Sequence, residues 1–160
     1  MEVLFCADTM PVLSALKGVF VIRKSKSMLG MPVVCHGERL GRVSYVLPDE
    51  ALHTISGLYF HCGVAGSRFI RFDQLELIGD LAVLTHDSGK RMQLHHQPLL
   101  RRALAQDGAR IGAITDILID EGTLRIEGLE LSRGYLDDLS HGRECVRQYT
   151  VQKNGDIIVG

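Results

Sequence analysis

The chain contains no tryptophan, and aromatic residues make up only 6% of its 160 positions. Because 46% of the residues are nevertheless hydrophobic, we expect a core built almost entirely from leucine, isoleucine and valine. No stretch reaches the ~18 consecutive apolar residues that a membrane-spanning helix requires. We therefore expect no direct insertion into a membrane.

Neither charge nor cysteine content reaches an extreme. The formal net charge is −1, which argues against a non-specific nucleic-acid binder, because such proteins carry an electropositive surface. The four cysteines show no CxxC spacing, and the first 22 residues lack the basic region and cleavage site of a signal peptide. Reduced thiols in a cytoplasmic location are therefore the default expectation.

Catalytic signatures are also missing from the sequence. It has no phosphate-binding P-loop, no dinucleotide-type glycine run and no Ser/His/Asp nucleophile motif. We therefore expect a protein that is not an enzyme, has no cofactor and takes no small-molecule substrate.

An internal repeat is the strongest feature of the sequence. Residues 37–50 recur as residues 108–121 at a constant offset of 71. The match resumes near the end of each copy at an offset of 76, where Arg71 corresponds to Arg147, and the same offset aligns Val83 with Val159. The change in offset places extra residues between roughly Ser132 and Arg143, a polar segment bounded by glycines. We expect a longer surface loop there.

Each copy of the repeat reads as a series of short strands. Segments 40–47 and 111–119 are rich in valine and isoleucine, and each is followed at once by a second apolar segment, at 52–60 and 123–131. Glycines inside these strands indicate bulges, bends or close backbone approaches, as at the corners of a barrel. A small closed barrel would also remove the exposed sheet edges. The sequence therefore predicts an all-β protein of two tandem small β-barrels, packed tightly together because each alone would bury little surface.

The ordered motifs of both copies resemble the PRC-barrel family. The segments that carry this resemblance are 29–33, 37–43, 69–72 and 77–83 in the first copy and 108–114 and 155–159 in the second. The resemblance divides the chain into an N-terminal extension (1–22), a first barrel (23–88), and a linker with a second barrel (89–160). The second copy departs from the family pattern at 101–105, which replaces a Gly-x-Pro-Val element. That segment is either a strand or, from Pro98 to Ala105, a short helix.

The family resemblance also implies a role. The PRC-barrel family is similar to the cytoplasmic domain of the photosynthetic reaction-centre H subunit and to the C-terminal domain of the ribosome maturation factor. We therefore expect an adaptor or assembly factor that binds a protein partner or a second copy of itself. A link to ribosome or RNA processing, with a ribonucleoprotein as a possible partner, is the first specialisation to consider. Association with a photosystem or another membrane complex is the second.

Four arginines are candidate binding residues, because they occupy equivalent places in both copies. They are Arg39, Arg71, Arg110 and Arg147. Such repeated arginines either dock an acidic partner or simply flank turns.

A cysteine and histidine cluster in the first copy is the alternative site. Zinc binds cysteine and histidine in tetrahedral sites, and a meander of strands could bring the two pairs together. The four candidate ligands are Cys35, His36, His61 and Cys62. The structural alternative is that neighbouring residues on a strand point to opposite faces, with a buried cysteine filling the core.

The remaining polar pairs have simpler interpretations. His95 and His96 lie in the linker and are expected to be solvated. The Asp-Glu pairs that begin at Asp49 and Asp120 fall at hairpin tips, where we expect the aspartate to cap the turn. Residues 1–22 are a structured segment, a disordered tail or an upstream translation artefact.

Overall fold

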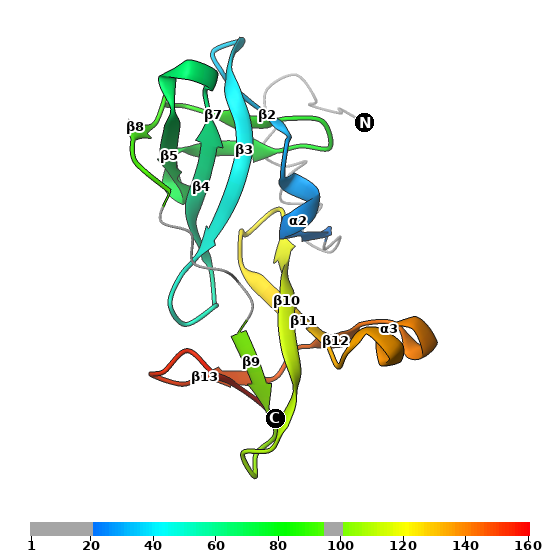
Figure 1. Ribbon diagram of the computed structural model, residues 1–160. Helices are drawn as coiled ribbons and strands as arrows, with labels where there is room; N and C mark the ends of the chain where they lie inside the picture. Colours follow the sequence, from blue (N-terminus) through cyan, green and yellow to red (C-terminus); the bar gives the residue numbers. More distant parts are fainter. Residues whose placement is uncertain (1–20, 95–100) are drawn as a thin grey trace, which may run out of the picture.

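The computed structural model describes residues 21–94 and 101–160 of this chain. These residues form two curled sheets, each a half-barrel, which lie one above the other in Figure 1. Nearly all of the predicted N-terminal extension, and the pair His95 and His96, lie outside the described residues. Within the described part of the chain, no helix has both the length and the apolar character needed to cross a membrane.

The first sheet is built from the first copy of the repeat. Its strand order is β6-β7-β2-β3-β4-β5-β8, with β2 and β7 parallel and the other neighbours antiparallel. Two short 3-10 turns, η2 (Gly63–Ala65) and η3 (Phe72–Gln74), interrupt the meander. The strands are β2 (Pro32–Cys35), β3 (Glu38–Pro48), β4 (Ile55–His61), β5 (Ser67–Arg71), β6 (Leu75–Ile78), β7 (Val83–Thr85) and β8 (Lys90–Arg91).

The second sheet repeats this order as β13-β14-β9-β10-β11-β12, again with one parallel pair, β9 and β14. The segment that departed from the expected pattern is the strand β9, not a helix. The predicted insertion is not a loop but the helix α3 (Tyr135–His141). The strands are β9 (Arg101–Leu104), β10 (Arg110–Asp120), β11 (Ile126–Ser132), β12 (Glu144–Val146), β13 (Tyr149–Val151) and β14 (Ile157–Val159).

The two sheets also share their irregularities. The pairing of β3 with β4 shifts register between Val43 and Tyr45, and that of β10 with β11 shifts between Ile114 and Asp116, 71 residues later. Near the end of each copy the sequence alignment was wrong by two residues. Val33 on β2 pairs with Val83, and Ala103, the equivalent residue on β9, pairs with Ile157. Val83 therefore corresponds to Ile157 and not to Val159.

Glycine is required where each long strand bends. A Cβ added to Gly41 would lie 2.3 Å from the carbonyl oxygen of His61, and one added to Gly112 would lie 2.3 Å from that of Ser132. Neither carbonyl can move without disturbing the sheet to which it belongs. Of the predicted roles for these glycines, the close backbone approach is therefore present, and a register shift lies beside each of them in the pairing with β2 or β9.

The two halves share one hydrophobic core and are joined at their hairpin tips. Leu52, at the tip between β3 and β4, is 1% exposed and belongs to the same cluster as Ile157 of the second sheet. The backbone N–H of Ile55 donates to the carbonyl of Leu124 at 3.2 Å, so the two tips also share backbone hydrogen bonds. The expected tight packing of the halves is present, and the core is aliphatic apart from a few aromatic rings.

The hairpin tips are capped by aspartate, as predicted. Asp49 Oδ1 accepts hydrogen bonds from the backbone N–H groups of His53 and Thr54, at 2.7 and 3.2 Å. Asp120 Oδ1 does the same for Gly122 and Thr123, at 2.8 and 3.2 Å. These carboxylates hold the turns and are not arranged as an acid–base pair.

An arm at the start of the described chain crosses from one half to the other. It consists of β1 (Ile22–Lys24) and the single-turn helix α2 (Ser25–Met28). β1 pairs antiparallel with β10 of the second sheet, although the repeat assigned residues 23–27 to the first copy. The side chain of Met28 is fully buried between the halves.

One basic residue of this arm binds carboxylates of both halves. The Arg23 side chain is only 13% exposed, and it binds Glu121 of the second half and, at 2.8 Å, Asp80 of the first. The arm therefore fastens the two halves together.

Candidate protein-binding surface

The four predicted arginines do not form one surface. Along the first sheet, Arg39 lies at the start of β3, whereas Arg71 is level with Leu47, close to the end of that strand. At ~3.3 Å per residue the eight-residue separation corresponds to roughly 26 Å. Arg110 and Arg147 are separated in the same way on the second sheet.

The surroundings of these arginines also differ. Arg71 forms an exposed ion pair with Asp73 at 2.9 Å, and its backbone N–H donates to the side chain of Gln74 in the following turn. This arrangement is that of an arginine flanking a turn. Arg39 is exposed and lines a shallow hollow of about 320 Å³.

The four candidate metal ligands are divided between two places. His61 and Cys62 line that same hollow at the end of β4. Cys35 is buried opposite Glu38, at a part of β3 that extends beyond its pairing with β4. Glu38 is four residues from the residue that pairs with His61, or about 13 Å along the strand. In residues 21–94 and 101–160, no three side chains of the metal-binding types are close enough together to hold an ion.

Helix α3 carries the most exposed group of large apolar side chains. Tyr135 and Leu136 are each 78% exposed, and Leu139 is 67% exposed. Positions three and four apart lie on one face of a helix, so these residues form a single apolar face. No residue of α3 is buried. Figure 1 shows the helix projecting sideways from the second sheet.

The polar side of α3 faces the protein instead. Asp138 is only 17% exposed at its side chain, and its Oδ2 accepts hydrogen bonds from Ser132 at 2.7 Å and Arg143 at 3.3 Å. Gly134 and Gly142 bound the helix with positive φ angles. Because a surface helix normally buries its apolar face, this reversed orientation leaves an apolar surface available to a partner.

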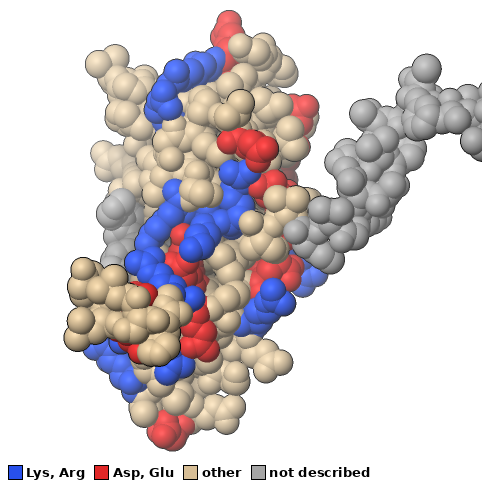
Figure 2. All heavy atoms as spheres, turned by 90° about the vertical axis from the view of Figure 1, so that its right-hand side faces the viewer, with Lys and Arg blue, Asp and Glu red and all other residues tan. Residues whose placement is uncertain are grey.

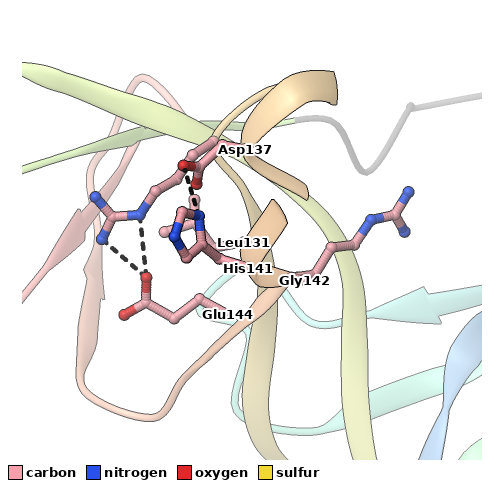
Figure 3. A pocket seen from close by; sticks show the side chains of 7 residues that line it. Leu131, Asp137, His141, Gly142 and Glu144 are labelled. Carbon is pink, nitrogen blue, oxygen red and sulfur yellow. Dashed lines mark hydrogen bonds and ion pairs between the residues drawn. The ribbon is translucent and has the colours of Figure 1, made fainter. Parts of the chain in front are cut away.

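A hollow of about 450 Å³ lies between α3 and the start of β12 (Figure 3). Arg133 forms hydrogen bonds with Glu144 at 2.8 and 3.1 Å across it, and His141 lies 3.4 Å from Asp137. The basic and acidic side chains therefore balance one another. This arrangement suits polar contacts around an interface and provides no nucleophile beside a base.

Buried charge attaches α3 and the arm to the second sheet. The Glu130 side chain, on β11, is 6% exposed and binds both Lys24 of the arm and Arg143, the latter at 2.8 Å. Burial alone would raise its pKa, but hydrogen bonds from Lys24, Arg143 and Thr115 lower the pKa to about 2. Glu130 is therefore ionised at neutral pH and fixes the base of α3.

Charge on the face that carries α3 is mixed. Figure 2 shows lysine and arginine gathered in a band across this face, with aspartate and glutamate directly beside it. The ion pairs of Lys24, Arg133 and Arg143 account for part of this mixing. Positive and negative side chains therefore lie next to one another on this face.

The sequence prediction missed α3 as a site. Its apolar residues stand at relative positions 1, 2 and 5, a spacing that brings them together on a helix. That signal was available, but the flanking glycines and polar residues favoured a loop.

Neither a protein-family model nor a curated protein matches this sequence.

Proposed function

We propose that this chain is a non-enzymatic, tandem PRC-barrel protein that acts as a protein-binding adaptor or assembly factor. The single observation that supports this role most strongly is the reversed orientation of α3. Three large apolar side chains face solvent while Asp138 holds the helix to the sheet. Six strands follow the same order in both sheets, β6-β7-β2-β3-β4-β5 in the first and β13-β14-β9-β10-β11-β12 in the second, which supports the proposal of a tandem PRC-barrel protein.

The partner is a protein with an apolar groove into which α3 inserts. A helix of two turns covers much less than the ~800 Å² per partner of a standard interface. Additional contacts beside the helix are therefore needed, and its balanced ion pairs favour a polar rim around an apolar centre. The mixed charge of this face favours protein over RNA as the direct contact, even where the partner belongs to a ribonucleoprotein.

The test compares three forms of the tagged protein in a native cell lysate, with bound proteins identified by mass spectrometry. They are the wild type, the double variant Leu136→Ser/Leu139→Ser, and Leu81→Ser as the matched control. Leu81 is 84% exposed in the turn between β6 and β7, away from α3. We expect a partner that the wild type and the Leu81 variant retain and the α3 variant loses.

Two further measurements complete the experiment. Nuclease treatment separates a direct protein partner from one held through RNA, and light scattering of the purified forms detects self-association that depends on α3. An identical set of bound proteins for all three forms would refute a role for α3, and an empty set for the wild type would refute the adaptor function.

A further inference from the structure

In the first half, the edge of β5 is covered by another part of the same chain. Strand β8 pairs with it, placing Arg91 opposite Arg68 and Lys90 opposite Phe69. Gly89, which precedes β8, fits so closely that an added Cβ would lie 2.9 Å from the carbonyl oxygen of Phe69. The backbone groups of β5 therefore have partners on both sides.

In the second half, the corresponding strand is β12, and none of residues 21–94 and 101–160 forms a strand along its outer edge. Among the described residues β12 pairs with one strand only, β11. The correspondence rests on contacts as well as on strand order. The Phe69 ring covers Gly57 in the first half, and the Cys145 sulfur covers Gly128 in the second, 3.1 Å from where a Cβ would be. Cys145 thus takes the place of Phe69.

This correspondence shows which backbone groups point outward. The Met92 N–H donates to the Ser67 carbonyl at 3.1 Å, so the backbone of Ser67 faces β8. Alternate residues of an antiparallel strand point their N–H and C=O groups to the same side, so Phe69 also faces β8. At the open edge of β12, the equivalent outward-facing residue is Cys145.

Charge at this edge has been reversed between the halves. The first half sets Arg68 opposite Arg91, a like-charge pair, whereas Glu144 stands where Arg68 does. Opposite charges that face each other across strands stabilise the pairing by ~0.2–1 kcal/mol. Arg133 binds only the Oε2 atom of Glu144, so a basic residue on a strand laid on β12 would pair with Oε1.

We propose that β12 accepts an extended segment of a partner protein as an added antiparallel strand, with a lysine or arginine opposite Glu144. This inference rests on the proposed protein-binding function and supplies the contacts beside α3 that the helix alone lacks. Strand addition derives affinity from main-chain hydrogen bonds and specificity from alternate side chains. Figure 1 shows β12 next to α3, so one partner can engage both.

The probe for this test is a synthetic peptide of residues 87–93 of this chain, the segment that covers β5 in the first half. Peptide is titrated to millimolar concentration into the isotope-labelled full chain, and backbone amide shifts are followed by NMR. We expect saturable shifts centred on Cys145. Reversing the charge with Glu144→Lys should weaken the binding about fivefold, as expected for the loss of a favourable cross-strand pair.

Two proline substitutions provide the controls. Cys145→Pro removes the outward N–H from an edge strand, where proline is tolerated, and should abolish the shifts, while Cys145→Val retains them. The same loss is expected when the wild-type protein meets a peptide carrying Lys90→Pro, so the test survives if the protein variant fails to fold.

The absence of shifts with the wild type, or shifts that persist with both prolines, would overturn strand addition at β12. Neither result affects the outcome of the lysate comparison of the α3 variants, so either proposal can be refuted while the other stands.

Discussion

The outer faces of the two sheets use equivalent positions for opposite chemistry. In the first half, Tyr45, Tyr59 and Phe69 lie side by side across three strands, with ring centroids 6.4 and 4.8 Å apart. In the second half, the positions 71 residues after the tyrosines hold Asp116 and Glu130, which face each other on β10 and β11. The same backbone thus carries an aromatic row in one half and a buried acidic pair in the other.

The acidic pair explains why the arm crosses to the second half. Asp116 is 1% exposed and accepts hydrogen bonds from the Ser25 hydroxyl and the backbone N–H of Lys26. Glu130 binds Lys24. The comparison shows that six strands keep the same order in the two sheets while equivalent positions on the outer faces carry different side chains, which in the second half hold the arm.

The largest loss of stability should follow substitution of Gly41 and Gly112, the glycines that occupy equivalent positions in the two halves. Gly41→Ala and Gly112→Ala each force a Cβ against a backbone carbonyl at 2.3 Å, and each should lower the free energy of unfolding by about 3 kcal/mol. Gly108→Asn is the control, because its Cβ meets open space and asparagine tolerates the positive φ of 85°. Chemical denaturation measures all three. A mild effect in one half alone would show that the two bends are not equivalent.

The dependence of the free energy of unfolding on pH should involve the acidic pair but not the aromatic row. The folded pKa of Glu130, about 2, lies below its ordinary value of 4.5. Its ionised form therefore stabilises the fold above pH 4.5, and this contribution of up to about 3 kcal/mol is lost as the pH falls toward 2.

Glu130→Gln should flatten the dependence of unfolding free energy on pH in this range. Tyr59→Phe, at the equivalent position, should leave it unchanged. Parallel urea titrations between pH 2 and 6 provide the measurement, and an unaltered acid dependence in the glutamine variant would contradict the assignment.

A smaller effect is expected at Asp116. Replacing it with alanine leaves the Ser25 hydroxyl and buried backbone N–H groups without their acceptor, at a cost of about 2 kcal/mol. Ser25→Ala and the double variant complete a thermodynamic cycle, with an expected coupling of about 1 kcal/mol. Strictly additive losses would mean that the arm does not depend on this contact.

Local patterns were sufficient to predict the strands, the bends and the capped tips. Each depends on residues close together in sequence, and the repeat supplied a second copy of every pattern. The arm was not predictable in this way, because Ile22 pairs with Asp120 and nothing near residue 22 signals so distant a partner. The alignment error at Val83 arose because the offset of 76 also matches Gly79-Asp80 with Gly155-Asp156. The two glycines are not structurally equivalent, because Gly155 has a positive φ and Gly79 does not.

The candidate site was less predictable than the fold. Repeated arginines and adjacent Cys-His pairs attract attention in a sequence, but strand length sets them far apart along the sheet. The surface on α3 depends on which side of a short helix faces inward. That orientation is decided by Asp138 meeting Ser132 and Arg143, a contact with no sequence pattern of its own.

The crossing arm has a consequence for the order in which the molecule is made. Arg23 emerges from the ribosome early, but Glu121, its partner, is synthesised 98 residues later. Until then, Met28 has no second half to pack against. Residues far apart in sequence lose much conformational entropy before their favourable contacts form. We therefore expect the arm to pair with the second half last. Its closure then locks two separately formed half-barrels into one cooperative unit.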